Sequence, residues 1–230
     1  MLIQFQNLSK SYGSNTILDI ELLSISSGEC IGLVGNNGAG KTTAFSLLLD
    51  LIKASNGQVL SKGADVSANE SWKSYTGAFI DETFLIDFLT PEEYFQFIAG
   101  LHDWSDEDVS SFLDQFEEFF NSEILGQKKY IRDLSKGNQK KVGIIGALIG
   151  DPEIVILDEP FASLDPTSQN RLKNLIKSRI DKHTFLISSH DLNHVADVSS
   201  RLVVLEKGKV IMDEIKTEEA IGKMTDYFNV

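Results

Sequence analysis

The sequence is short of the residues that stabilise disulfide-rich proteins and of those that bind nucleic acids. It has one cysteine in 230 residues, Cys30, so an internal disulfide is excluded and the thiol suits a reducing compartment. Basic residues are outnumbered, because 21 lysines and arginines face 34 aspartates and glutamates, for a formal net charge of -13. This balance argues against a nucleic-acid partner, whose binding needs Lys and Arg at the phosphates. It also disfavours direct attachment to anionic lipid.

Long apolar runs are absent as well. The longest, residues 144–149, is far shorter than the roughly 20 residues of a membrane-spanning helix. Residues 1–10 lack the basic start and apolar block of a signal peptide. The hydrophobic fraction of 42% and the charged fraction of 24% are ordinary for a globular domain. We therefore expect any role at a membrane to depend on a protein partner.

Alternating strand and helix patterns predict an α/β fold. Continuous apolar runs at 30–34, 154–157 and 184–188 are typical of parallel strands buried on both faces. Further strands are expected at 2–5 and 17–23, with a turn over 11–14, and as a hairpin over 201–212. The remaining helical patterns lie at 42–52, after Asp165-Pro166, and at 217–230.

The middle of the chain predicts a helical subdomain. Thr90, Pro91 and Glu93 form a helix start with a capping box, and Ser105 opens a second helix. The first helix is predicted to carry one apolar stripe made of Tyr94, Phe97, Ile98 and Leu101. We predict one domain over residues 1–230, with 1–84 and 151–230 as the catalytic core and about 85–150 as the helical subdomain.

A phosphate-binding loop follows the strand at 30–34. Residues 35–42 fit G-x-x-x-x-G-K-[ST], in which glycines let backbone N–H groups turn toward phosphate oxygens. A chance glycine-rich turn is the alternative, but a strand precedes this loop and a helix follows it. The predicted ATP-binding residues are Gly35, Asn36, Asn37, Gly38, Ala39, Gly40, Lys41, Thr42 and Thr43.

Two carboxylates end the strand at 154–157. Asp158 is expected to hold Mg²⁺ together with the hydroxyl of Thr42, and Glu159 to polarise the attacking water. Taken alone the segment is weakly specific, because many strands end in Asp or Glu. Its pairing with the phosphate loop about 120 residues earlier favours the functional interpretation, because a buried strand delivers its acids to the sheet edge where α/β proteins bind ligands.

With these motifs the chain resembles the ABC ATPase family. Residues 134–139, Leu-Ser-Lys-Gly-Asn-Gln, are similar to the family's signature L-S-G-G-Q, with a helix following. The resemblance implies that this segment binds the γ-phosphate held by a second subunit. The residues it assigns are Ser135, Lys136, Gly137, Asn138 and Gln139. An ordinary capped helix start is the alternative for the hexamer alone.

Further segments match the family in order. Ser163-Leu164-Asp165 resembles its dimer-contact loop, although Asp165 also suits a helix cap. His190 resembles the family's switch histidine, expected to contact the γ-phosphate and position Glu159. Tyr12 lies where the family has an aromatic residue stacked on adenine, with a place in the core as the alternative. The histidines at 102, 183 and 194 are interpreted as structural.

One segment departs from the family pattern. A glutamine that touches Mg²⁺ is usual after the strand that precedes the helical subdomain, whereas this chain has Asp81-Glu82 there. The nearest match makes Asp81 the metal ligand. An acidic residue here resembles the bacitracin- and lantibiotic-type exporters, and the Leu-Ser-Lys-Gly form of the signature resembles exporter-type members of the family.

The resemblance implies a P-loop NTPase core with a mostly parallel sheet, an N-terminal antiparallel β subdomain and an inserted α-helical subdomain. It implies an ATPase with ATP and Mg²⁺ as cofactors, a second ATPase subunit, and an integral membrane permease that places the chain at the cytoplasmic face of the membrane. Phe84, Leu85 and Phe88 are candidate contacts for the permease, or else pack the subdomain. A soluble ABC ATPase of translation or DNA repair, and another P-loop enzyme such as a nucleotide kinase or GTPase, are the alternatives.

Overall fold

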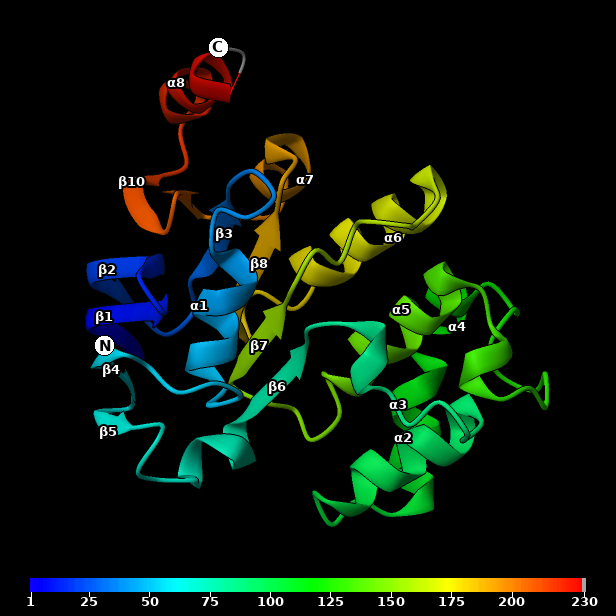
Figure 1. Cartoon of the computed structure of the whole chain (residues 1–230). Coiled ribbons are helices and arrows are strands. Elements are labelled where there is room, and N and C mark those ends of the chain that lie inside the picture. The colour runs from blue at the N-terminus through cyan, green and yellow to red at the C-terminus, as the bar shows by residue number, and fades with distance from the viewer. Residues whose placement is uncertain (229–230) are drawn as a thin grey trace.

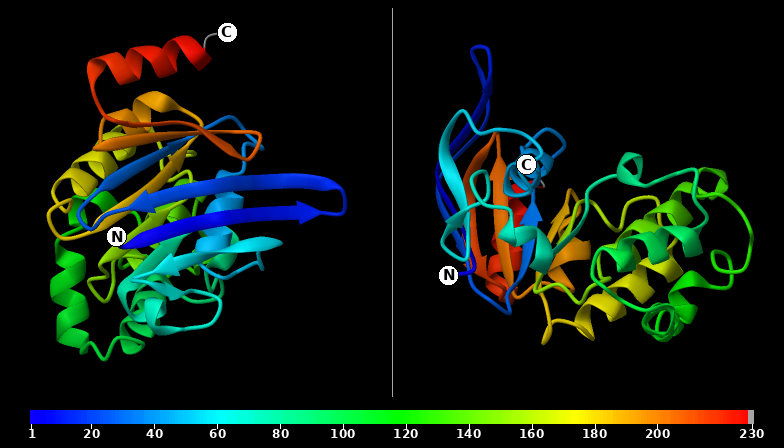
Figure 2. Two further views of the ribbon diagram at one scale, coloured as in Figure 1. Left: turned by 90° about the vertical axis from the view of Figure 1, so that its left-hand side faces the viewer. Right: turned by 90° about the horizontal axis from the view of Figure 1, so that it is seen from below.

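The chain forms two β-sheets and a group of helices beside the larger sheet, as the computed structural model shows for residues 1–228 (Figures 1 and 2). Within these residues the strands are β1 (Ile3–Tyr12), β2 (Asn15–Ile25), β3 (Cys30–Val34), β4 (Asn56–Ser61), β5 (Ala64–Asp65), β6 (Thr76–Phe79), β7 (Ile154–Leu157), β8 (Thr184–Ser189), β9 (Arg201–Glu206) and β10 (Lys209–Ile215). The α-helices of the same region are α1 (Lys41–Leu48), α2 (Pro91–Gly100), α3 (Asp106–Asp114), α4 (Glu117–Phe120), α5 (Lys136–Gly146), α6 (Pro166–Lys177), α7 (Leu192–Ala196) and α8 (Glu218–Phe228). Short 3-10 helices are η1 (Ser71–Tyr75), η2 (Glu82–Phe84) and η3 (Ile131–Asp133).

The larger sheet confirms the predicted mostly parallel core. Its strand order is β10-β9-β3-β8-β7-β6, and every neighbouring pair is parallel except β10 with β9. In the register, Leu157 lies opposite Ile187 and Val34 opposite Ser189. The carboxyl ends of β3, β7 and β8 therefore lie at one edge of the sheet. The smaller sheet, β2-β1-β4-β5, is antiparallel throughout.

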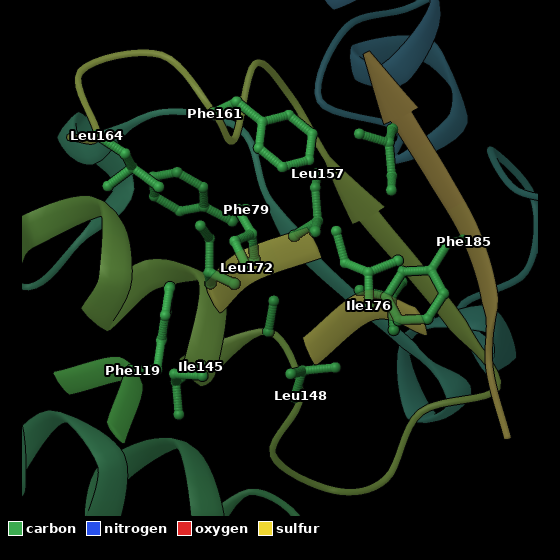
Figure 3. Close-up of a cluster of buried hydrophobic side chains, with 14 of the residues drawn as sticks. Phe79, Phe119, Ile145, Leu148, Leu157, Phe161, Leu164, Leu172, Ile176 and Phe185 are labelled. Atoms are coloured by element: carbon green, nitrogen blue, oxygen red, sulfur yellow. The ribbon is translucent and has the colours of Figure 1, made fainter. Parts of the chain in front are cut away.

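Each buried strand contributes to two hydrophobic clusters, because successive side chains point to opposite faces. Along β7, Ile154 and Ile156 belong to a cluster that also contains α1 and the antiparallel sheet. Val155 and Leu157 belong to the other cluster, which continues into the helices. Figure 3 shows part of this second cluster, where Phe185 of β8 lies near side chains of α6. The continuous apolar runs in the sequence are explained by this burial on both faces.

The helices of the middle segment start where the sequence predicts. Thr90 accepts a hydrogen bond from the Glu93 N–H at 3.3 Å, the Glu93 carboxylate accepts one from the Thr90 N–H at 2.8 Å, and Pro91 is the first helical residue. Ser105 forms a second capping box with Asp108. The second hydrophobic cluster runs from the sheet into α2, α3, α4 and α5 without a break. The division at residues 84 and 151 therefore stays a prediction.

Three expectations about local structure were wrong. The N-terminal strands are longer than predicted, so the turn is confined to residues 13–14 and Tyr12 ends β1. Helix α1 stops at Leu48 rather than 52, before Asp50 with its positive φ of 49°. On α2 the predicted stripe is only partly buried, because Phe97 and Leu101 are exposed. The buried side chains of that helix are Pro91, Tyr94, Phe95 and Ala99.

The last predicted helix is present as α8, and its final two predicted residues, 229–230, lie outside the described part. Within residues 1–228 no helix is long and apolar enough to cross a bilayer.

Candidate nucleotide-binding and catalytic site

The glycine-rich loop connects β3 to α1 at the edge where β3, β7 and β8 end. Gly38 and Gly40 have φ of 83° and 106°, a conformation that side-chain-bearing residues rarely adopt. At Gly35 a Cβ atom would lie 2.4 Å from the Leu205 carbonyl oxygen, so only glycine fits there. A pocket of about 250 Å³ opens over residues 37–43, with Ile17 and Glu159 at its wall. Its size and its backbone N–H groups suit a phosphate chain at a helix N-terminus.

The lysine of the loop lies inside this cradle. The Lys41 side chain is buried, and its Nζ donates to the Gly35 carbonyl at 2.6 Å. The same Nζ lies 3.2 Å from Oε1 of Glu159. A buried ammonium group needs such partners, because an unpaired charge in the interior is strongly destabilising. Lys41 thus lines the pocket, and its ammonium group is placed to bind phosphate oxygens there.

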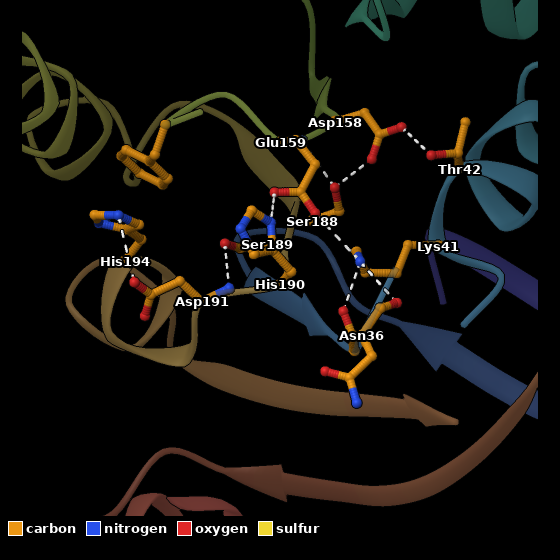
Figure 4. A network of polar contacts seen from close by, with 12 residues as sticks. Asn36, Lys41, Thr42, Asp158, Glu159, Ser188, Ser189, His190, Asp191 and His194 are labelled. Atoms are coloured by element: carbon orange, nitrogen blue, oxygen red, sulfur yellow. Dashed lines mark hydrogen bonds and ion pairs between the residues drawn. The ribbon is translucent and has the colours of Figure 1, made fainter. Parts of the chain in front are cut away.

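The two acids after β7 have different surroundings (Figure 4). Asp158 is buried, and its carboxylate accepts hydrogen bonds from Thr42 Oγ1 at 2.5 Å and from the Ser188 hydroxyl. Burial raises the pKa of Asp158, while these two hydrogen bonds act in the opposite direction. Glu159 is only partly buried and faces the pocket. The sequence could not distinguish these environments.

Glu159 is held in place both at its backbone and at its side chain. Its backbone takes a left-handed φ of 45°, and its N–H donates to Ser188 Oγ at 2.9 Å. Its Oε2 lies 2.9 Å from Nδ1 of His190, and Oε1 faces Lys41. His190 itself is 52% exposed at the end of β8. The structure therefore brings together Lys41, Thr42, Asp158, Glu159 and His190, as predicted from the shared sheet edge.

Two oxygen groups of this site fit a magnesium ion. The Thr42 hydroxyl and the Asp158 carboxylate touch each other, and both are hard oxygen ligands of the kind Mg²⁺ prefers. Within residues 1–228 no group of three His, Cys, Asp or Glu side chains forms a protein-only metal site. Mg²⁺ is usually held by one or two side chains together with substrate phosphates, and Thr42 and Asp158 would be those side chains here.

The third predicted metal ligand, Asp81, lies in a different setting. Its carboxylate caps η2 by accepting from the Thr83 N–H at 2.8 Å. Among the described residues no hydrogen bond or ion pair joins Asp81 to Thr42 or Asp158. The adjacent Glu82 is the less exposed acid and lies 3.6 Å from Nζ of Lys140. The role of Asp81 as a metal ligand stays a prediction.

The signature segment forms the start of α5. Ser135 caps the helix by accepting from the Asn138 N–H at 3.2 Å. Gly137 packs on the neighbouring loop, since a Cβ atom there would lie 3.0 Å from the Ser163 carbonyl oxygen. Gln139 is buried and donates to the Leu134 carbonyl at 3.1 Å, so it supports the segment from within. Among residues 1–228 no hydrogen bond or ion pair joins residues 135–139 to the glycine-rich loop.

Three other predicted residues, Lys136, Asp165 and Tyr12, lie in different local settings. Lys136 is exposed, and its Nζ donates to Gln139 Oε1 at 3.3 Å. Asp165 caps α6 through the N–H groups of Thr167 and Ser168. Tyr12 is 58% exposed with the Lys10 ammonium 4.6 Å from its ring centre, so it is not part of the core. Its contact with adenine stays a prediction.

Sequence reasoning missed two residues of this site. Ser188 is fully buried and bonds both acids, Asp158 through its hydroxyl hydrogen and Glu159 through its oxygen. Lys140 is almost as buried, and its ammonium donates to the Glu159 carbonyl at 2.9 Å. A serine at the end of an apolar strand and a lysine in a helix are common. Only their three-dimensional neighbours distinguish them.

Comparisons with known proteins agree with this geometry. Residues 19–162 match the protein family described as ABC transporter. The chain is 32% identical to the ABC transporter ATP-binding protein YhaQ of Bacillus subtilis (strain 168), over 96% of this chain and 74% of that protein. It is 30% identical to the lantibiotic transport ATP-binding protein SrtF of Streptococcus pyogenes, over 99% and 96% of the two chains. A solved structure of an ATP-binding subunit of an ABC transporter superposes with a TM-score of 0.85 at 25% identity, over 98% and 94%.

On this fold, a glycine-rich phosphate loop, an acidic strand end and a histidine 2.9 Å from the second acid agree with an ABC ATPase cassette. The chain belongs to the ABC transporter family, as an ATP-binding subunit. This confirms the predicted fold, ATPase class and transporter function. The alternatives of a nucleotide kinase or GTPase, and of a soluble cassette in translation or DNA repair, are thereby set aside.

Proposed function

We propose that this chain drives the export of a substrate through a separate membrane permease, with Glu159 as the general base of ATP hydrolysis. The observation that supports this most directly is the position of the Glu159 carboxylate. It lies at the wall of the phosphate pocket, between Lys41 and His190. A carboxylate held there by two partners is oriented toward a water molecule attacking the terminal phosphate.

The remaining residues of the site bind and orient the nucleotide. Backbone N–H groups of residues 36–41 surround the phosphates, and the Lys41 ammonium exchanges its contacts with Gly35 and Glu159 for phosphate oxygens. Thr42 and Asp158 would hold Mg²⁺, which supplies charge neutralisation between the phosphates. Once Lys41 turns to the phosphates, Oε1 of Glu159 is free to accept a proton from water. Oε2 of Glu159 keeps its contact with His190.

A second ATPase subunit completes the site in this proposal. Ser135 and Gly137 lie exposed or half-buried at the start of a helix, with a hydroxyl and a helix dipole suited to an anion. Among the described residues no hydrogen bond or ion pair joins them to the phosphate loop of their own chain, which supports binding to the nucleotide of a partner subunit. A structure 23% identical to this chain, superposing with a TM-score of 0.82, is described as a dimeric ABC transporter cassette.

The permease would dock beside η2. Phe84 and Phe88 are 60% and 61% exposed, and Phe84 borders a pocket of about 280 Å³ between η1, β6 and α2. Exposed aromatic side chains beside a hollow suit a helix of a protein partner. Leu85, the third predicted anchor, is buried and packs the core instead. This contact would keep the chain at the cytoplasmic face of the membrane.

Export is favoured over import by the relatives. SrtF is named for lantibiotic transport, and a protein of Bacillus subtilis (strain 168) with 31% identity is named as the SkfA peptide export ATP-binding protein SkfE. The acidic pair Asp81-Glu82 and the Leu-Ser-Lys-Gly signature agree with this branch. A peptide is accordingly the proposed class of cargo.

The test compares Glu159→Gln with the wild-type chain in ATP hydrolysis and in nucleotide binding. The proposal expects the variant to lose at least about 100-fold in hydrolysis rate, because general-base catalysis contributes this much, while still binding ATP. Rapid hydrolysis by the variant would remove Glu159 from its role. Purification of the tagged variant from membranes with ATP present should recover an integral membrane protein, and recovery of soluble partners alone would contradict the permease.

A further inference from the structure

The backbone carbonyl of Glu159 has a charged partner outside the nucleotide pocket. This oxygen accepts a hydrogen bond from the Ala162 N–H at 3.2 Å, as in an ordinary turn, and a second one from Nζ of Lys140 at 2.9 Å. Lys140 belongs to α5, one turn after Ser135, whereas Glu159 follows β7. The bond therefore joins the signature helix to the residue proposed as the general base.

The lysine is too buried to be a surface charge. Lys140 is 6% exposed, and its ammonium lies 5.8 Å from the ring centre of Phe79. A buried ammonium ion requires compensation by an opposite charge or by several acceptors. The opposite charge comes from Glu82, whose Oε1 lies 3.6 Å from Nζ and which is itself only 16% exposed. Three groups thus form one chain of contacts from Glu82 through Lys140 to the Glu159 carbonyl.

The acidic segment adds a second negative charge on the same side. The pKa of Asp81 is lowered mainly by hydrogen bonds from Thr83, with smaller contributions from the positive charges of Lys136 and Lys140. The two lysines stand four residues apart on α5 and thus on one face of that helix. Two acids therefore face two lysines, and the charges of this segment are balanced by α5 rather than by residues of the phosphate pocket.

We propose that Lys140 is a positioning residue for ATP hydrolysis, which holds the Glu159 backbone through its carbonyl and is itself held in place by Glu82. The proposal deepens the function argued above and rests on Glu159 being the general base. The left-handed φ of 45° at Glu159 gives a physical reason. A non-glycine residue in this conformation is strained and persists only where its surroundings fix it. A charge-assisted bond to the carbonyl provides such fixation.

The contacts from Glu82 through Lys140 to the Glu159 carbonyl give the acidic segment Asp81-Glu82 a role in this proposal. Glu82 directly precedes Thr83 and Phe84 in η2, beside the exposed aromatic side chains proposed to meet the permease. Displacement of η2 would move the Glu82 carboxylate relative to Lys140, and with it the support of the Glu159 carbonyl. The presence of Glu82 next to Asp81 is then explained by the buried lysine that Glu82 neutralises.

The experiment measures ATP hydrolysis, ADP affinity and thermal stability for four variants of the full chain: Lys140→Met, Lys140→Arg, Glu82→Gln and the double variant Glu82→Gln/Lys140→Met. Lys140→Met keeps the length of the side chain and removes its charge. We expect kcat to fall about 10- to 100-fold, as for a misplaced catalytic group, with KM and ADP affinity nearly unchanged. Lys140→Arg should restore much of kcat, because a donor and a charge are present again.

The Glu82 variants test the chain of contacts. Glu82→Gln should lower kcat less than Lys140→Met does, and the double variant should be no slower than Lys140→Met alone, because both act through one bond. The matched control is Lys173→Met, away from the site. Lys173 lies on α6, is 15% exposed, and forms an ion pair with Asp197 at 2.6 Å. This control should lose stability without losing kcat.

Either of two outcomes for Lys140→Met overturns the inference. In the first, Lys140→Met keeps kcat within about twofold of wild type, which leaves no positioning effect. In the second, its loss equals that of Lys173→Met, so that only general stability is affected. If Lys140→Met does not fold, a wild-type kcat in Glu82→Gln decides against the proposal. The hydrolysis rate of Glu159→Gln is measured alongside. A wild-type rate in Glu159→Gln refutes Glu159 as the general base. A lost rate in Glu159→Gln together with a wild-type rate in Lys140→Met refutes only the positioning role of Lys140.

Discussion

Replacing Ser188 by alanine should destabilise the chain more than any other loss of a single hydroxyl at this site. Its side chain is fully buried, donates to the Asp158 carboxylate and accepts from the Glu159 N–H at 2.9 Å. A hydrogen bond to a charged group contributes about 1.5–3 kcal/mol and a neutral one about 1 kcal/mol. In the variant, the Asp158 carboxylate and the Glu159 N–H would each lose this hydrogen bond, and the alanine side chain would offer none in its place. We therefore expect Ser188→Ala to lower the free energy of unfolding by about 2–4 kcal/mol.

The loss should depend on pH with a definite sign. Burial raises the pKa of Asp158, and the hydrogen bond from Ser188 opposes this, so the alanine variant raises that pKa further. A carboxyl group with a higher pKa in the folded than in the unfolded protein destabilises the fold once it ionises. Its ionisation cost is absent below the unfolded pKa and is complete above the folded pKa. Ser188→Ala should thus cost more at neutral than at mildly acidic pH.

The assay is urea unfolding of the wild type and the variant at both pH values. Ser199→Ala is the control, because Ser199 is also buried and its hydroxyl has no partner stronger than the Cys30 thiol. This control should change the free energy of unfolding by less than about 1 kcal/mol. Equal effects of the two substitutions, or a Ser188→Ala cost that grows as the pH falls, would refute the reasoning.

Three further predictions concern other parts of the chain. Gly143→Ala should destabilise by about 1–3 kcal/mol in thermal unfolding, because the new Cβ would lie 2.1 Å from the Phe79 ring; an unchanged melting temperature would contradict this packing. Burial raises the pKa of Cys30 to about 12, so a thiol reagent should label the native chain far more slowly than the urea-unfolded chain; comparable rates would contradict it. Tyr12→Ala should weaken ATP binding by about 1–3 kcal/mol in a fluorescent-nucleotide titration while Tyr12→Phe does not, and equal affinities would place Tyr12 outside the base site.

Local chemistry explains what could be predicted from the sequence. A capping box needs only residues three positions apart, so the starts of α2 and α3 follow from Thr90 and Ser105. The phosphate loop is equally local, because Gly38 and Gly40 supply the positive φ values within one turn. The meeting of Asp158 with Thr42 follows from one nonlocal rule, that parallel strands end at the same edge.

What could not be predicted depends on which neighbour a side chain meets. Helix α2 has apolar residues around much of its circumference, and the sequence pattern does not say whether Phe95 or Phe97 faces the core. In the structure Phe95 is buried among other aromatic rings, whereas Phe97 is exposed. The same limit applies to Glu82, because its partner lies 58 residues away on another element, at a distance that no sequence spacing encodes.

Helix α5 connects the parts of the site that the sequence treats as separate motifs. Its first turn presents Ser135, its second turn carries Lys140 against the Glu159 carbonyl, and its later turns approach the core through two glycines. Close contact at these glycines leaves no room for the helix to slide, since a Cβ at Gly143 or Gly146 would collide with Phe79 or Tyr94. A helix fixed in this way moves as one body. Any displacement of α5 would therefore shift together the proposed contact to the partner's phosphate and the proposed support of Glu159, so one element would join dimer closure to the geometry of hydrolysis in this mechanism.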